Sequence, residues 1–304
     1  MLRHPVDREA RGQLTALVAV AALLPLAVLG SATSASGFYL RTFRNCPVNN
    51  PGMTENGGLC LYARSHNTSE FAAGNAVVPL ERSLVLQGGV YSNSEEKTVF
   101  VGPENGAPTL VPVGQVVPGG LANVIDPAKL SGAVLREFEK VGPARQKVTA
   151  VIELAGAPSA ISFSLANLAF QEGTALGLPL KVRFKNDFLG ENCLAGSDAA
   201  PIIVELTDGT TSPPAPNEPI SGKLGTGRET HEGVIMIMEN SLVNNSFAAP
   251  GVEGCGREPA WQEQVDAAID AKVDLPAPAG HNASIITGAL GAAESGRVKE
   301  HLGL

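Results

Sequence analysis

The sequence predicts a mainly β protein, a β-sandwich-like domain with two or three peripheral helices. The chain holds 34 glycines and 22 prolines. The segments between them are too short and too rich in β-branched residues for a helical bundle. Short strand-like segments alternate with long polar connections, a pattern typical of a sandwich rather than of an open parallel sheet.

Seven segments have the composition of strands, and turn residues bound each of them. They are Ser83–Val90, Thr98–Gly102, Thr109–Val113, Lys147–Leu154, Leu178–Phe184, Ile202–Leu206 and Val234–Met238. In the fifth segment, polar and apolar residues alternate from Lys181 to Phe184, as in a strand with one wet face. The last segment is apolar throughout, so we expect it to be covered on both sides.

Three segments are candidates for helices. Asp126 followed by Pro127 predicts the start of a helix over residues 126–142 with one apolar face. A second helix is expected over residues 259–275, because the following proline cannot continue it. The third candidate, Ser284 to His301, is marginal since three glycines dilute it.

The first 35 residues have the order of an export signal, a signal peptide. Arginines at positions 3, 8 and 11 precede the uncharged segment Leu14–Leu29, and small residues at 33–35 suit cleavage before Ser36. The alternative is an uncleaved membrane anchor, but the apolar run is shorter than the ~20 residues that a spanning helix needs, and Pro25 interrupts it. We therefore expect a secreted or extracellular chain, with association to the cell envelope as a further option.

Residues 36–304 are enough for one large β domain. The proline-rich stretch 207–219 is either a linker between two domains or a long surface loop. A disulfide from Cys193 to Cys255 would span this stretch and tie its flanks together. We therefore expect a surface loop within a single β-rich extracellular domain.

Four cysteines follow the signal, and an even number in an oxidising compartment predicts two disulfides. Three pairings are possible, and proximity in the chain favours Cys46–Cys60 and Cys193–Cys255. A zinc site would need closely spaced cysteines or histidines, and these cysteines lack that spacing.

The charge balance predicts the classes of partner. The chain carries 22 basic and 30 acidic residues, a net charge of −8. Such an acidic surface lacks the electrostatic footprint of a nucleic-acid-binding protein and would be repelled by anionic lipid and acidic polymers. We expect no nucleic-acid partner and no stable membrane insertion after signal cleavage. The expected partner is an envelope or extracellular ligand of unspecified chemistry.

Two histidines in loops are the candidates for a catalytic role, since binding and catalytic residues concentrate in loops. His231 precedes Glu232, and His281 lies between Gly280 and Asn282. Adjacent residues of a strand point to opposite faces, so His231 and Glu232 would converge only in a tight turn. An exposed or hydrogen-bonded histidine is the simpler interpretation of both.

Three acidic residues, Asp187, Glu191 and Asp198, are the candidates for a metal site. Carboxylate-rich extracellular loops can bind calcium, although this spacing matches no EF-hand. We predict neither a resident metal nor another cofactor for this chain.

The usual motifs of secreted enzymes do not occur in the sequence. It contains no Gly-x-Ser-x-Gly, and the glycine pairs at 88–89 and 119–120 lack the spacing of phosphate-binding loops. A Ser-His-Asp site on another fold needs no such motif. Trp261, the only tryptophan, is either a platform for stacking a sugar or a core residue, and its place on the apolar side of a helix favours the core.

Four phrases of the sequence carry a resemblance. They span residues 78–89 (VPLERSLVLQGG), 178–190 (LPLKVRFKNDFLG), 210–217 (TTSPPAPN) and 247–256 (FAAPGVEGCG). Together they resemble an uncharacterised secreted protein family of high-GC Gram-positive bacteria. The resemblance implies export to a bacterial envelope or beyond, and it brings no activity or catalytic residue with it.

By elimination, the sequence predicts a secreted, disulfide-stapled, non-catalytic surface or binding protein. The alternatives are a secreted hydrolase with a His-centred site and a calcium- or metal-binding extracellular module. Fold class alone does not choose among them, because sandwiches host binding proteins and hydrolases alike. A histidine within reach of a serine or carboxylate inside a concave pocket would favour the hydrolase.

Overall fold

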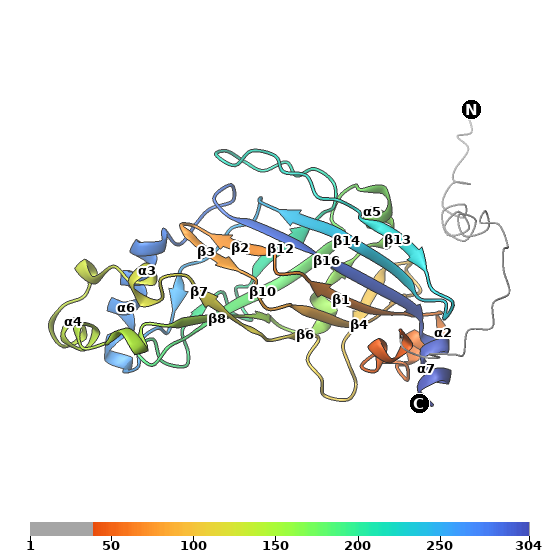
Figure 1. The fold of residues 1–304 in the computed structure, drawn as a ribbon, viewed down its shortest axis with the longest axis horizontal. Coiled ribbons are helices and arrows are strands. Elements are labelled where there is room, and N and C mark those ends of the chain that lie inside the picture. The colour runs from red at the N-terminus through yellow and green to blue at the C-terminus, as the bar shows by residue number, and fades with distance from the viewer. Residues whose placement is uncertain (1–38, 304) are drawn as a thin grey trace, which may run out of the picture. The chain divides into compact units, whose positions relative to one another are not determined.

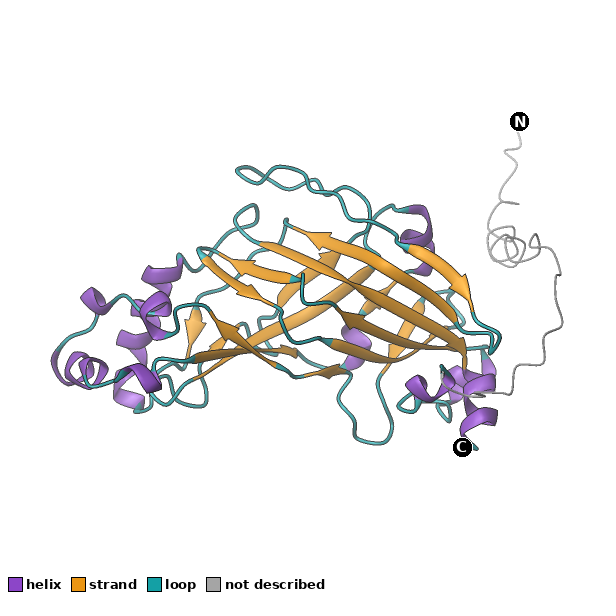
Figure 2. Ribbon diagram, in the orientation of Figure 1, coloured by secondary structure: helices purple, strands orange, loops and turns teal. Residues whose placement is uncertain are grey.

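A computed structural model describes residues 39–303, which belong to the compact unit Gly37–Leu304. The predicted export signal, residues 1–35, lies outside the described residues. Within the described part of the chain, one antiparallel sheet of nine strands and another of seven are the principal elements (Figures 1 and 2). The prediction of a mainly β, sandwich-like fold is therefore confirmed.

The first sheet is built around the twelve-residue strand β16 (Ala283–Glu294), which pairs with β14, β1 and β2. The main strand order is β13-β14-β16-β1-β4-β5, while β3 pairs with β2 and β6 pairs with β4. The other strands are β1 (Leu59–Ser65), β2 (Glu70–Ala73), β3 (Ala76–Pro79), β4 (Val85–Ser92), β5 (Thr98–Val101), β6 (Leu110–Val111), β13 (Thr226–Glu229) and β14 (Ile235–Asn244).

The second sheet is built around β10 (Leu176–Lys185), which pairs with β8, β9, β11 and β12. Its main order is β15-β11-β10-β8-β7. The other strands are β7 (Gly114–Val117), β8 (Val148–Leu154), β9 (Ser162–Phe163), β11 (Leu194–Ala195), β12 (Ile202–Leu206) and β15 (Val252–Glu253). Backbone hydrogen bonds between Thr207 and Val243, 2.9 and 2.7 Å long, join the two sheets at one corner.

The helices are short and lie around the sheets. Among the described residues there are six α-helices, three of which have seven or more residues. They are α2 (Pro51–Glu55), α3 (Leu121–Val124), α4 (Gly132–Glu139), α5 (Leu165–Phe170), α6 (Gln262–Val273) and α7 (Ser295–Leu302). The 3₁₀ turns are η2 (Leu40–Phe43), η3 (Pro127–Lys129), η4 (Pro143–Arg145), η5 (Pro158–Ala160) and η6 (Pro259–Trp261). Helices α3, α4 and α6 gather at one end of the sheets, and α2 and α7 lie at the other (Figure 1).

The main core lies between the inner faces of the two sheets, and the two-residue period of the strands decides which side chains reach it. In β12, Ile202, Val204 and Leu206 are buried, while Ile203 and Glu205 between them are exposed. One continuous apolar cluster includes side chains of β1, β4 and β5 from one sheet and of β8, β10 and β12 from the other. This cluster makes the two sheets a sandwich.

A second, smaller apolar cluster covers the other face of the first sheet, at the end that carries α2 and α7. Its buried members include Phe43, Met53 and Val298. The disulfide between Cys46 and Cys60 lies within this cluster and links the segment after η2 to β1. The first described residues of the chain are thereby fixed on the sheet.

Two of the three predicted helices need correction. The segment 284–301 is a strand, β16, followed by the helix α7. Its glycines serve a strand here, because a Cβ atom at Gly288 would collide with the carbonyl oxygen of Arg64 on β1. The segment 126–142 divides into η3 and α4, since Leu130 is extended and Gly132 has a positive φ of 56°. The helix expected over residues 259–275 is present as η6 and α6.

The expectation that Val234–Met238 is covered on both sides is wrong. Ile235 is 51% exposed and Met238 is 37% exposed. Strand β14 pairs on one side with β13, which lies at the edge of the sheet and whose four residues are all exposed. Position near a sheet edge leaves this run open to solvent in spite of its composition.

The proline-rich stretch 207–219 is a surface loop that folds back on itself. The amide of Thr211 donates to the carbonyl of Ile220 at 2.8 Å, and the Thr210 and Ser221 hydroxyls lie 2.8 Å apart. At its far end, the side-chain amide of Asn217 donates to the backbone carbonyls of Asn245 and Asn282, both at 2.9 Å. The loop is therefore held along its length by hydrogen bonds.

Candidate functional site

The structure places His231 in a turn beside Glu232. The His231 side chain is 73% exposed, and its Nε2 lies 3.7 Å from a Glu232 carboxylate oxygen. The side chain of Glu232 is buried, and its carboxylate accepts the backbone N–H groups of Tyr39 and Leu40, each at 3.0 Å. Glu232 thus fixes the start of η2, a structural role, while His231 projects into solvent.

His281 is exposed in the turn before β16. Its neighbour Asn282 is buried, and the Asn282 amide donates to the carbonyls of Phe247, Ala277 and Pro278. The polar residue with a structural function in this turn is therefore Asn282. Neither candidate histidine lines the cleft at the end of β10 that contains Asp187 and Glu191.

The three acidic candidates do not converge on a cation site. Asp198 pairs with Lys181 at 2.7 Å and accepts the N–H of Gly156 at 2.8 Å. The hydrogen bond from Lys181, followed by that from Gly156, lowers the pKa of the Asp198 carboxyl. Asp187 and Glu191 lie elsewhere, in a cleft dominated by basic side chains. Across residues 39–303, no group of three or more histidine, cysteine or acidic side chains is arranged to hold a metal ion.

Asp187 and Glu191 lie together in this cleft, of about 1070 Å³, which we call the basic cleft. It lies at the end of the second sheet where β10 ends and β8 begins. Five of its lining side chains are cationic and two are acidic. The lining comprises Ala144, Arg145, Lys147, Arg183, Lys185, Asn186, Asp187, Gly190, Glu191, Asn192 and Arg257.

Strand periodicity explains why cations gather on this face. Along β10, Val182 is buried toward the core, so Arg183 and Lys185 share the opposite, outward face. Lys185 is paired in register with Thr149 of β8, and Lys147 lies two residues before Thr149. Lys147 and Lys185 are therefore diagonal neighbours on one face, a relation that puts residues about 7–8 Å apart.

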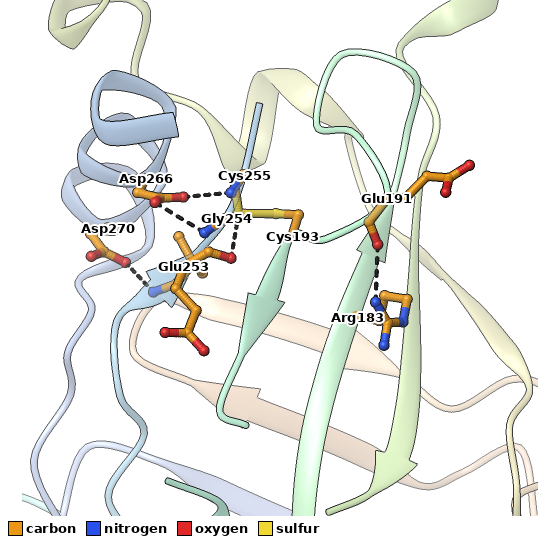
Figure 3. Close-up of a disulfide and its surroundings, with 9 residues drawn as sticks. Arg183, Glu191, Cys193, Glu253, Gly254, Cys255, Asp266 and Asp270 are labelled. Carbon is orange, nitrogen blue, oxygen red and sulfur yellow. Dashed lines mark hydrogen bonds between the residues drawn. A yellow bond between two sulfur atoms is a disulfide. The ribbon is translucent and has the colours of Figure 1, made fainter. Parts of the chain in front are cut away.

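Arg183 is neutralised and serves to hold the cleft together. Its Nε and Nη2 donate to the two carboxylate oxygens of Glu153 at 2.9 and 3.1 Å, and its Nη1 donates to the carbonyl of Glu191 at 2.9 Å. The hydrogen bond to Glu153 raises the pKa of Arg183. Figure 3 shows the bond from Arg183 to the backbone of Glu191. Arg183 thus orients the loop that follows β10.

The remaining cations are available to a ligand. Among residues 39–303, Arg145, Lys147 and Lys185 form no ion pair. Arg257 lies 3.5 Å from the exposed carboxylate of Glu258, and its guanidinium sits 5.3 Å from the centre of the Trp261 ring. The cleft therefore has a local excess of positive charge, in contrast to the net negative charge of the chain.

The backbone around the cleft is cross-linked. The amide of Asn186 donates to the carbonyls of Arg145 and Lys147, both at 2.8 Å. The disulfide between Cys193 and Cys255 joins the loop after β10 to the segment that carries Arg257 (Figure 3). The two disulfides predicted from the sequence are both present, with the pairing that proximity in the chain favours. The charged side chains are thus mounted on a fixed base.

Two carboxylates on α6 support the strand behind this disulfide. Asp266 accepts the N–H groups of Gly254 and Cys255 at 3.1 and 2.8 Å, and Asp270 accepts that of Val252 at 2.9 Å (Figure 3). Burial raises the pKa of both carboxyls, against the lowering effect of these hydrogen bonds. They act on the backbone, and neither lines the cleft.

An aromatic side pocket of about 130 Å³ adjoins the basic cleft and shares Arg145, Asn186, Asp187 and Arg257 with it. Phe188 and Trp261 line this pocket, with their ring centres 6.2 Å apart. Trp261 is half-buried and packs against the main core, yet one part of it reaches the pocket. Trp261 therefore packs against the core, as predicted, and it also lines the aromatic side pocket.

Sequence reasoning identified Asp187 and Glu191 but missed the cations beside them. The alternation from Lys181 to Phe184 correctly predicted a wet strand face. It gave no signal that Arg145, Lys147 and Arg257, from other segments, face the same cleft. For the described residues, the lining of the cleft contains no histidine, serine or cysteine.

No protein-family model matches the sequence, and comparisons with curated proteins and with solved structures find no similar chain. Among residues 39–303, no helix is both long enough and apolar enough to cross a membrane. The function therefore has to be inferred from the geometry of the basic cleft itself.

Proposed function

We propose that this chain is an exported, non-catalytic binding protein whose ligand is an anion held in the basic cleft. Export is supported by the signal-like first 35 residues and by two disulfides, which persist in oxidising compartments. The expected setting is the bacterial envelope or the extracellular space, in line with the resemblance to secreted proteins of high-GC Gram-positive bacteria.

One observation carries the choice of ligand charge. A protein of net charge −8 gathers Arg145, Lys147, Lys185 and Arg257 around one concavity, and three of these four cations have no ion-pair partner among the described residues. Like charges held close together repel each other unless an anion separates them. A bound anion would relieve this repulsion, whereas a cation would add to it.

A binding role is favoured over catalysis by the composition of the lining. Nucleophilic catalysis needs a nucleophile next to a general base, and among described residues the cleft lacks histidine, serine and cysteine. The candidate base His231 is exposed and lies outside this lining, next to a carboxylate occupied with backbone amides. The hydrolase alternative with a His-centred site therefore has no observation in its favour among the described residues.

The test uses Trp261, the only tryptophan in the chain, as an internal reporter beside the cleft. Purified protein lacking residues 1–35 is titrated with tripolyphosphate and with oligogalacturonate, by tryptophan fluorescence and by calorimetry. We expect at least one of these anions to bind, and the variant Lys147→Glu/Lys185→Glu to bind about tenfold more weakly.

The matched control is Lys97→Glu/Lys223→Glu, which makes the same change in net charge at two exposed lysines outside the cleft. We expect this control to bind almost as tightly as the unaltered protein. Equal weakening of binding in both double variants would show a general charge effect. If neither anion bound to the unaltered protein, the proposed function would be contradicted.

A further inference from the structure

We propose that the ligand of the basic cleft is an acidic polysaccharide, bound as an extended chain with one sugar ring at the aromatic side pocket. This inference rests on the proposed function and adds the class of ligand to it. Three features support it: the exposure of the cations, the two free carboxylates among them, and the continuity of the cleft with the aromatic side pocket.

The exposure of the cations favours a ligand with many charges over a small anion. Arg145, Lys147 and Lys185 are all exposed, and the side chain of Arg257 is 54% exposed. Each ion pair formed at such a site is weak and is screened by salt. A ligand that offers several acidic groups to several cations gains from all of them together. The volume of about 1070 Å³ likewise exceeds what one small anion fills.

The arrangement of the cations fits a chain. Lys147 and Lys185 are diagonal neighbours on β8 and β10, and Arg257 comes from the other side of the disulfide. The charges thus come from three separate segments that line one cleft, where successive acidic groups of a polymer would meet them. A single phosphate or carboxylate would contact only part of this set.

The two acidic residues distinguish a polysaccharide from other polyanions. The side chains of Asp187 and Glu191 are exposed in the cleft and form no hydrogen bond or ion pair with any described residue. An ionised carboxylate is only an acceptor, so its favourable partner is a hydroxyl or amide donor. Sugars carry hydroxyl groups next to their acidic groups. Polyphosphate offers no such donors and polyglutamate only its backbone N–H groups, so the repulsion of both by these carboxylates is less offset.

The aromatic side pocket adds a place for an apolar ring face. It shares Arg145 and Arg257 with the cleft, so one chain can occupy both. Phe188 is buried against Trp261, so the half-buried indole, with the exposed Arg257 guanidinium 5.3 Å from its ring centre, supplies the accessible apolar surface together with a polar N–H. The C–H face of a pyranose ring suits such a surface. A nucleic-acid base also stacks on aromatic rings, and single-stranded DNA is therefore included in the test.

The experiment compares polymers on protein that lacks residues 1–35. The probes are oligogalacturonate, dextran sulfate, neutral dextran, polyglutamate and oligodeoxythymidine. We expect the two acidic polysaccharides to bind with a change in Trp261 fluorescence, and galacturonate monomer and neutral dextran to bind at least about tenfold more weakly. Equal or tighter binding of polyglutamate or DNA would overturn the inference while leaving anion binding intact.

The decisive variant is Asp187→Ala/Glu191→Ala, at two side chains without structural partners. For oligogalacturonate we expect weaker binding by about threefold to tenfold, because hydroxyl acceptors are lost. For polyglutamate we expect tighter binding, because two negative charges are removed. The same gain for both polymers would show that the carboxylates only repel anions, and the polysaccharide assignment would fail. Failure of every anionic probe would instead contradict the proposed function.

Discussion

The two disulfides lie in two different apolar clusters, at opposite ends of the sheets. Cys46–Cys60 closes 14 residues of sequence and is embedded in the smaller apolar cluster, with Phe43, Met53 and Val298. Cys193–Cys255 closes 62 residues and is completely buried in the main core, with the Asp266 carboxylate of α6 accepting the Cys255 N–H and the basic cleft on the neighbouring loop. The same bond thus supports a covered end of the sheets and an end that carries an open binding surface.

The comparison shows how stability and function are divided in this fold. At the covered end, apolar burial and the disulfide act together, since Met53 and Cys60 are completely buried. At the cleft end, the disulfide is also completely buried, but the cations beside it are exposed and repel each other, so the covalent bond and backbone hydrogen bonds hold the segments that carry them. We therefore expect the two disulfides to differ more in their effect on binding than in their effect on stability.

The largest effect is expected at the cleft end. Replacing both cysteines in Cys193→Ala/Cys255→Ala opens the longer loop, and the chain-entropy estimate is a loss of about 4 kcal/mol in the free energy of unfolding. Because this bond joins the loop after β10 to the segment with Arg257, anion binding should also be lost. Urea unfolding and tryptophan fluorescence titration measure the two effects, and intact binding would contradict this account of the cleft.

The covered end should lose stability alone. For Cys46→Ala/Cys60→Ala the corresponding estimate is about 3 kcal/mol, since the loop is shorter. Neither residue lines the cleft, so anion affinity should stay within about twofold of the unaltered protein when measured below the melting temperature. If this variant lost anion binding as fully as Cys193→Ala/Cys255→Ala, the two disulfides would not have separate effects on binding, contrary to this expectation.

The smallest effect concerns the half-buried carboxylates behind the cleft. Burial raises the pKa of Asp270 in the folded protein. A carboxyl with a raised folded-state pKa favours folding below its ordinary pKa and loses that contribution as the pH rises through the folded value. Asp270→Asn keeps one acceptor for the N–H of Val252 and removes the charge. We expect its melting temperature to rise by about 1–2 °C at pH 7 and to depend less on pH.

Asp266→Asn is the matched control for this prediction. Asp266 accepts two N–H groups with two different oxygens, so an amide in its place loses one acceptor. We expect this variant to be less stable than the unaltered protein at pH 7. If Asp270→Asn were destabilised equally, the ionised form of Asp270 would be stabilising, and the sign of the expected pH dependence would be wrong.

The strands that sequence reasoning found are those in which local composition and final environment agree. Strands β8, β10 and β12 have β-branched or alternating residues between turns, and they lie in the sheets as expected. Strand β16 was missed because its segment was interpreted as a helix weakened by glycines. Close packing against β1 in fact requires a glycine at position 288. The exposure of Ile235 was also missed, since a strand's place in a sheet is not local information.

The sequence by itself determined the β class, the number of disulfides and the expectation of export. These depend on residue types, short-range periods and the order of segments, all of which are local properties. Only the tertiary structure decided the site, because Arg145 and Lys147, the segment 183–191 and Arg257 are three separate parts of the sequence. Electrostatic interactions depend on distances in space. The net charge of −8 is a sum over the whole chain, so it does not reveal a cleft with a local excess of positive charge.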